Sequence, residues 1–142
     1  MANHLHCGIT GTQRGLTPVQ ANQLRQSLVL FRDKGGTTIH HGDCIGADAQ
    51  ASAIAFDLGL LRVIHPPNNP GKRAHCLGEQ ILPEKPYLER NHDIVDATTI
   101  LFALPGEQTE QLRSGTWATV RYARKLGRPI LLLYPDGSLG PG

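Results

Sequence analysis

The chain of 142 residues is about the length of one domain, and its 39% of hydrophobic residues suffices for a single core. Its net charge of +2 is too small to indicate nucleic-acid binding by itself, and no window approaches the roughly 20 apolar residues of a membrane span. The first ten residues lack the basic and apolar regions of a secretory signal, and the three cysteines form no closely spaced pair, so we expect a soluble cytoplasmic protein without a cofactor.

The first half of the chain alternates short apolar runs with segments of helical period. Residues 5–9 predict a strand and 17–36 a helix, followed by a strand over 37–42. An alanine-rich helix over 46–59 and a strand over 61–66 complete this half.

Residues 66–86 hold most of the proline and polar residues in the middle of the chain. A structureless stretch of this length is uncommon in a compact domain. It contains Lys72, Arg73, His75 and Cys76, and two interpretations stay open: a lid over a bound anion, or a mobile insertion.

The second half continues the alternation, with helices over 87–97 and 114–127 and strands over 98–106 and 128–135. Strands that alternate with helices predict an α/β fold, a Rossmann-like three-layer α/β/α arrangement around a mostly parallel sheet of about five strands. We expect one domain over 1–135 and a disordered tail over 136–142. In such sheets ligands bind beyond the carboxyl ends of the strands, where the strand order reverses.

Four loops at that edge carry residues suited to anions or sugars. The first follows the first strand and contains Gly11, Thr12, Gln13 and Arg14. Glycine allows close backbone approach and the other three offer donors, although the spacing matches neither a Walker A loop nor the dinucleotide fingerprint.

The second loop follows the second strand, where Gly42 and Gly46 bracket a tight turn and Asp48 stands in the first turn of the next helix. That carboxylate either caps the helix or accepts hydrogen bonds from a ribose. The other candidate binding residues of this loop are Asp43, Cys44 and Ala47.

The same region holds His40, His41, Asp43 and Cys44, which are metal-ligand types. Neighbours along a strand point to opposite faces, and no second ligand pair is spaced to meet them, so we predict no metal site.

The third candidate is Arg90 with Asn91, at the sheet edge before the strand 98–106. A guanidinium there either grips a phosphate with two parallel hydrogen bonds or forms a surface ion pair with Glu89 or Asp93.

The fourth candidate is the start of the last helix, at Ser114, Gly115, Thr116 and Trp117, with Pro105 ending the preceding strand. Amides at a helix start lack partners, so a phosphate is the expected guest, with a plain serine cap and a core tryptophan as the alternative.

The order of the motifs GTQRG, HGDCIGADAQA, ERNHDIV with FALPG, and SGTWATVRYARKLGRP resembles the SLOG superfamily over residues 5–134. This group joins the DNA-processing protein DprA to the LOG phosphoribohydrolases, and its small YspA-like branch is the most similar. The resemblance also implies a homodimer that pairs through helices flanking the sheet.

The resemblance to LOG enzymes rests on Glu89-Arg90 and Gly115-Thr116, but Thr119 stands where their catalytic glutamate is expected. Nucleotide N-glycosidase activity therefore requires another acid, and the candidates are Asp43, Asp48, Glu107 and Glu110. If the chain is an enzyme, Arg90 and Asp48 are the candidate catalytic residues.

The DprA motifs are similar to Gly42 to Asp48, Arg90-Asn91, Ser114 to Thr119 and Gly127-Arg128, with His92 in place of a second arginine. DprA-like proteins bind single-stranded DNA, yet 5% aromatic residues and a weak charge favour a smaller ligand.

We therefore expect a nucleotide or nucleotide-derived small molecule bound through its phosphate, for sensing, sequestering or processing. The alternatives are a LOG-like N-glycosidase and DprA-like DNA binding. The simplest alternative is a scaffold without a ligand, in which the glycines only form turns.

Overall fold

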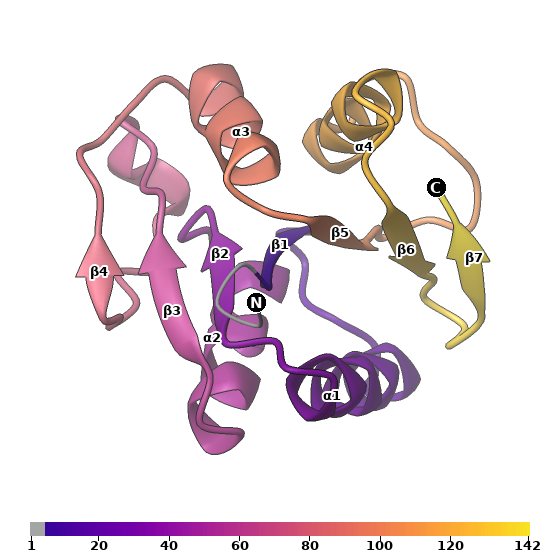
Figure 1. Cartoon of the computed structure of the whole chain (residues 1–142). Coiled ribbons are helices and arrows are strands. Elements are labelled where there is room, and N and C mark those ends of the chain that lie inside the picture. The colour runs from indigo at the N-terminus through magenta and orange to yellow at the C-terminus, as the bar shows by residue number, and fades with distance from the viewer. Residues whose placement is uncertain (1–4) are drawn as a thin grey trace.

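The computed structural model describes residues 5–142, in which helices and strands form three layers (Figure 1). A single sheet has the order β4-β3-β2-β1-β5-β6-β7, and every pair of neighbours is parallel except β6 and β7. No helix among the described residues is long and apolar enough to cross a membrane. The strands are β1 (His6–Gly11), β2 (Thr38–His41), β3 (Leu61–Ile64), β4 (Gln80–Ile81), β5 (Ile100–Leu104), β6 (Ile130–Leu133) and β7 (Leu139–Pro141).

Two helices cover each face of the sheet, as Figure 1 shows. Helices α1 (Pro18–Asp33) and α2 (Ala47–Asp57) pack on one face, while α3 (Tyr87–Asp96) and α4 (Gly115–Lys125) pack on the other. Each face has its own apolar core, because side chains alternate between the two faces along a strand. The predicted three-layer α/β fold is confirmed.

Local sequence signals explain how the first helix is positioned. Thr17 Oγ1 accepts a hydrogen bond from Gln20 N–H at 3.1 Å, and Gln20 Oε1 accepts one from Thr17 N–H at 3.2 Å, which is a complete capping box. The buried Gln20 amide also donates to the carbonyls of Pro105 and Leu133, at 2.9 and 2.8 Å. These bonds join the start of α1 to the carboxyl ends of β5 and β6.

The sheet contains two strands that the sequence did not predict. Within 66–86, Gln80 and Ile81 form β4 at the edge of the sheet, beside β3. The tail 136–142 was expected to be disordered, but Asp136 Oδ1 accepts a hydrogen bond from Ser138 N–H and a turn at Gly137 brings β7 back onto β6. Asp-Gly is a hairpin signal, whereas strands of two or three residues leave almost no periodicity to detect.

Candidate functional site

A cavity of about 320 Å³ opens at the carboxyl ends of β1 and β5. The strand order reverses here, since β2 lies on one side of β1 and β5 on the other, and the loops that follow diverge. We call this space the switch-point cavity. Seven of its lining residues were predicted from the sequence to bind the ligand, Glu107 was named as a candidate acid, and Tyr87 and Gly106 were not predicted. The lining consists of Gly11, Thr12, Gln13, Arg14, Tyr87, Gly106, Glu107, Ser114, Gly115 and Thr116.

The start of α4 supplies backbone donors to this cavity. Ser114 caps the helix, because its Oγ accepts a hydrogen bond from Trp117 N–H at 3.2 Å. Within residues 5–142, the N–H groups of Gly115 and Thr116 have no hydrogen-bond partner. An anion bound in the cavity would therefore meet two amides and the positive end of the helix dipole.

An exposed ion pair lies at the rim of the cavity. Arg14 Nη2 is 2.7 Å from Glu107 Oε2, and the two side chains are 70% and 33% exposed. The arginine packs over Gly106, where any Cβ would collide with its guanidinium. An exposed pair contributes only about 0–1 kcal/mol to stability, so Arg14 can exchange the carboxylate for a bound anion at little cost.

Tyr87, the first residue of α3, forms a wall that the sequence analysis missed. Its ring lies against the Arg90 guanidinium, with Cζ 4.6 Å from the ring centroid. A Cβ at Gly115 would lie 2.7 Å from the tyrosine hydroxyl, so any larger residue there would displace Tyr87. Its position directly after Pro86, at a helix start on the carboxyl edge, is the signal that could have found it.

Asp48 lies outside the cavity, at the start of α2. Its Oδ2 accepts hydrogen bonds from the N–H groups of Gly42 and Cys44, at 3.1 and 3.2 Å. Burial raises the pKa of this carboxyl to about 6, against the opposing effects of Arg90 and the two amides. The predicted helix cap is wrong, because α2 begins after Gly46 without a side-chain cap; the Asp48 carboxylate instead holds the β2–α2 loop through these two amides.

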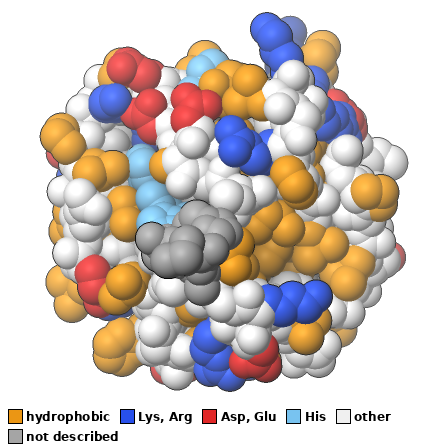
Figure 2. Space-filling view, in the orientation of Figure 1, with side chains coloured by type: hydrophobic (Ala, Val, Ile, Leu, Met, Phe, Trp, Pro, Cys, Tyr) orange, Lys and Arg blue, Asp and Glu red, His pale blue; other side chains and the backbone are white. Residues whose placement is uncertain are grey.

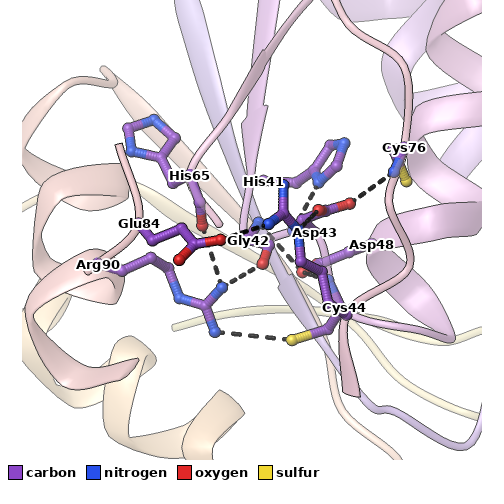
Figure 3. A network of polar contacts seen from close by, with 10 residues as sticks. His41, Gly42, Asp43, Cys44, Asp48, His65, Cys76, Glu84 and Arg90 are labelled. Atoms are coloured by element: carbon purple, nitrogen blue, oxygen red, sulfur yellow. Dashed lines mark hydrogen bonds and ion pairs between the residues drawn. The ribbon is translucent and has the colours of Figure 1, made fainter. Parts of the chain in front are cut away.

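Arg90 holds the same loop from the other side, as Figure 3 shows. It is 2% exposed, and its Nη1 donates to the carbonyl oxygens of Gly42 and His65, the latter at 3.2 Å. Its Nη2 lies 3.6 Å from Cys44 Sγ. The guanidinium therefore neither lines the switch-point cavity nor pairs with Glu89 or Asp93, because its Nη1 is bonded to two backbone carbonyls.

Asp43 joins the β2–α2 loop to the 66–86 segment (Figure 3). Its Oδ2 lies 2.7 Å from Arg73 Nε, and its Oδ1 accepts a hydrogen bond from Cys76 N–H at 2.8 Å. Burial disfavours the ionised carboxyl, but these bonds outweigh it and lower the pKa of Asp43. Arg73 Nη1 also reaches Glu84 at 2.7 Å. The interpretation of this segment as a mobile insertion is therefore not supported around Arg73.

The remaining predicted site residues pack in the core or in turns and do not face the switch-point cavity. Trp117 is 2% exposed and belongs to the core on the α3–α4 face. Gly46 has a φ of 86°, and a Cβ there would lie 2.5 Å from the Thr12 carbonyl oxygen. The same carbonyl accepts a hydrogen bond from Ala47 N–H at 2.9 Å, so the two loops touch through backbone atoms. Asn91 and Pro105 are also buried and do not line the cavity.

Three histidines form a hydrogen-bonded chain across the sheet, and Figure 2 shows such side chains gathered on one face. His6 Nδ1 lies 2.8 Å from His40 Nε2, and His40 Nδ1 lies 2.8 Å from His65 Nε2. Burial is the main cause that lowers the pKa of His40 to about 3 and that of His65 to about 4. Among residues 5–142, no group of three or more His, Cys, Asp or Glu side chains is placed to hold a metal ion.

Comparison with known proteins bears on the fold. No protein-family model and no curated protein sequence matches the chain. The molybdenum cofactor binding protein from the phototrophic bacterium Rippkaea orientalis matches 92% of this chain and 76% of its own, with a TM-score of 0.70 and 21% identity. The structural-genomics target TM1055 matches 91% and 74%, with a TM-score of 0.63 and 16% identity.

The third similar structure is DNA processing protein A (DprA) from Streptococcus pneumoniae. It matches 92% of this chain and 50% of its own, with a TM-score of 0.66 and 15% identity. The chain therefore has the fold that the motif resemblance to DprA implies. At these identities the likeness concerns the fold, and any function has to be argued from the site itself.

Proposed function

We propose that the switch-point cavity binds the phosphate of a nucleotide or nucleotide-derived small molecule. The observation that carries this proposal is the pair of unpartnered amides, of Gly115 and Thr116, that open into the cavity beside Arg14. Charge-assisted hydrogen bonds from a guanidinium and amides at a helix start are the usual means of holding a phosphate. Two proteins of this fold are described as a molybdenum cofactor binding protein and a DNA processing protein, which agrees with a ligand-binding function.

Calorimetry tests the proposal with AMP, 3′,5′-cyclic AMP and ADP-ribose. We expect Arg14→Ala to weaken binding by about tenfold or more, because a hydrogen bond to a charged group contributes roughly 1.5–3 kcal/mol. Arg25→Ala is the matched control, since Arg25 also forms one exposed ion pair, with Asp57 at 3.0 Å. Absence of heat with all three ligands, on folded protein, contradicts the proposal.

Hydrolysis of a nucleoside 5′-monophosphate is the second candidate, and one observation favours it. Of the acids that could replace the glutamate missing at Thr119, only Glu107 lines the cavity. Asp43 and Asp48 are buried against the β2–α2 loop, and Glu110 pairs with Arg121 and Arg124. Incubation with AMP should then release adenine, and Glu107→Gln should abolish the release while AMP still binds. If no adenine is released, binding without hydrolysis is the supported function.

Homodimer formation, expected from the resemblance, is part of the proposal. An apolar groove of about 560 Å³ runs between α1 and the strands β5, β6 and β7, and the hollow lined by hydrophobic side chains is visible in Figure 2. Leu30 and Leu139 at this groove are 60% and 49% exposed. Light scattering on the purified protein tests for the dimer, and Leu30→Asp should dissociate it if the groove is the contact.

A further inference from the structure

A second cavity, of about 240 Å³, adjoins the switch-point cavity. Its lining consists of Gln13, Cys44, Pro67, Asn69, Lys72 and Tyr87. The two cavities share Gln13 and Tyr87, so a ligand can extend from one into the other across the tyrosine. Ligand pockets usually measure about 300–1,000 Å³. The switch-point cavity alone is at the lower end of this range, whereas the two together fall well inside it.

Backbone hydrogen bonds fix the position of Lys72. Its carbonyl oxygen accepts a hydrogen bond from Ile45 N–H at 3.0 Å, which joins it to the β2–α2 loop. It ends a short 3₁₀ turn, Pro70–Lys72, which Asn69 caps by accepting a hydrogen bond from Gly71 N–H at 3.0 Å. These bonds hold the backbone of the Lys72 side of the second cavity against the β2–α2 loop.

The charges around this cavity favour an anion. Arg73, next to Lys72, is neutralised by Asp43 and Glu84, but among the described residues no carboxylate lies within 4.0 Å of the Lys72 ammonium. Burial raises the pKa of the Cys44 thiol, so the sulfur in this lining is uncharged at neutral pH. None of the six lining residues carries a negative charge at neutral pH.

Tyr87 fixes the wall between the two cavities. The Arg90 guanidinium lies against its ring at 4.6 Å, and that guanidinium is itself bonded to the Gly42 and His65 carbonyls. Tyr87 therefore has a fixed position between the cavity that holds the α4 amides and the cavity that holds Lys72.

We infer that the bound nucleotide carries two separate anionic groups: one occupies the switch-point cavity and the other lies in the second cavity beside Lys72. The chemical class is a nucleoside diphosphate or bisphosphate rather than a monophosphate. This inference rests on the proposed phosphate site and adds its second half.

The test is calorimetry with AMP, ADP and adenosine 3′,5′-bisphosphate, without divalent cations, on the wild type, Lys72→Ala and Lys125→Ala. Lys125 is the matched control, since it is an exposed lysine in the last turn of α4, far from the amides at its start. We expect at least one two-phosphate ligand to bind tenfold or more tightly than AMP. Lys72→Ala should remove this gain and change AMP affinity less than twofold, while Lys125→Ala changes neither.

Three results distinguish the ways in which the inference can fail. If AMP binds but neither two-phosphate ligand binds more tightly, the inference is wrong and the proposed function stands. If Lys72→Ala weakens AMP and the two-phosphate ligands equally, Lys72 belongs to the first phosphate site and the inference is again wrong. If no ligand binds to folded protein, both the proposed function and this inference are wrong.

Discussion

Two loops at the carboxyl edge of the sheet look alike in the sequence and differ in where their polar groups go. In the loop after β2, Asp48 accepts from the Gly42 and Cys44 amides, and Arg90 donates to the Gly42 carbonyl. In the loop after β5, the Gly115 and Thr116 amides have no partner within residues 5–142. Buried polar groups are usually hydrogen-bonded. The Gly42 and Cys44 amides already have an acceptor, so the first loop has few backbone donors left for a ligand, whereas the second has two available.

The comparison also shows that a glycine in such a turn can either make room for an internal side chain or shape a binding cavity. A Cβ at Gly42 would collide with the buried Arg90 guanidinium, and a Cβ at Gly115 would displace the Tyr87 hydroxyl. One glycine admits an internal arginine, and the other shapes a wall of the open cavity. Only the identity of the neighbouring side chain separates a structural glycine from one at a binding site.

The largest effect should come from Arg90→Met. It leaves the buried Gly42 and His65 carbonyls without their charged donor, and each buried unsatisfied group costs about 1–3 kcal/mol. We expect the free energy of unfolding to fall by roughly 3 kcal/mol or more in urea titrations. Arg25→Met should change it by less than about 1 kcal/mol. If the variant keeps its stability but no longer binds nucleotide, Arg90 contacts the ligand, and the proposed difference between the two loops is wrong.

The second largest effect should come from acid, which lowers the free energy of unfolding through the buried histidines. The pKa of His40 is about 3 and those of His41 and His65 about 4, chiefly through burial, against 6.5 in the unfolded chain. The pKa of Asp48 acts in the opposite direction, at about 6 in the fold against 3.8. Near pH 5 the unfolded chain therefore holds about two more protons than the folded chain.

The stability supplied by these neutral imidazoles is complete above pH 6.5 and is lost as the pH falls toward 4. The free energy of unfolding should decrease by on the order of 2–3 kcal/mol per pH unit at the steepest point. Urea titrations at pH 7, 6 and 5 measure it, and His40→Gln should flatten the dependence by about one proton. Stability that rises on acidification would mean that Asp48 outweighs the histidines.

Ser114→Ala should have a moderate effect at the open loop. It removes the side-chain acceptor of Trp117 N–H, and loss of an N-cap costs about 1 kcal/mol. Ser114→Gly should cost only a few tenths of a kcal/mol, because glycine is an acceptable cap. Thermal or urea unfolding measures both variants, and equal losses would show that Ser114 contributes something other than its cap.

The smallest change in stability should come from Arg14→Ala. The ion pair with Glu107 is exposed, so the free energy of unfolding should change by less than about 0.5 kcal/mol. The same variant should weaken phosphate binding in the switch-point cavity by about tenfold or more. A large loss of stability would place Arg14 with Arg90 among the internal supports.

The sequence by itself determined the fold class, the four helices and five of the seven strands. The capping box at Thr17 and Gln20, and the serine cap at Ser114, are encoded by residues only three positions apart, so the local sequence suffices to recognise them. Most of the switch-point cavity was predicted too, because the carboxyl edge of a parallel sheet gathers the loops. Strands β4 and β7 were missed because they are too short to show a period.

Only the tertiary structure decided what Arg90, Asp48 and Tyr87 do. Their roles depend on which atoms lie opposite them: the Gly42 carbonyl for Arg90, two amides for Asp48, and Gly115 for Tyr87. Gly42 is 48 positions from Arg90 along the chain, and the order of strands in the sheet brings the two together. A side chain's chemistry is local, but the groups that satisfy it are chosen by the packing of the whole domain.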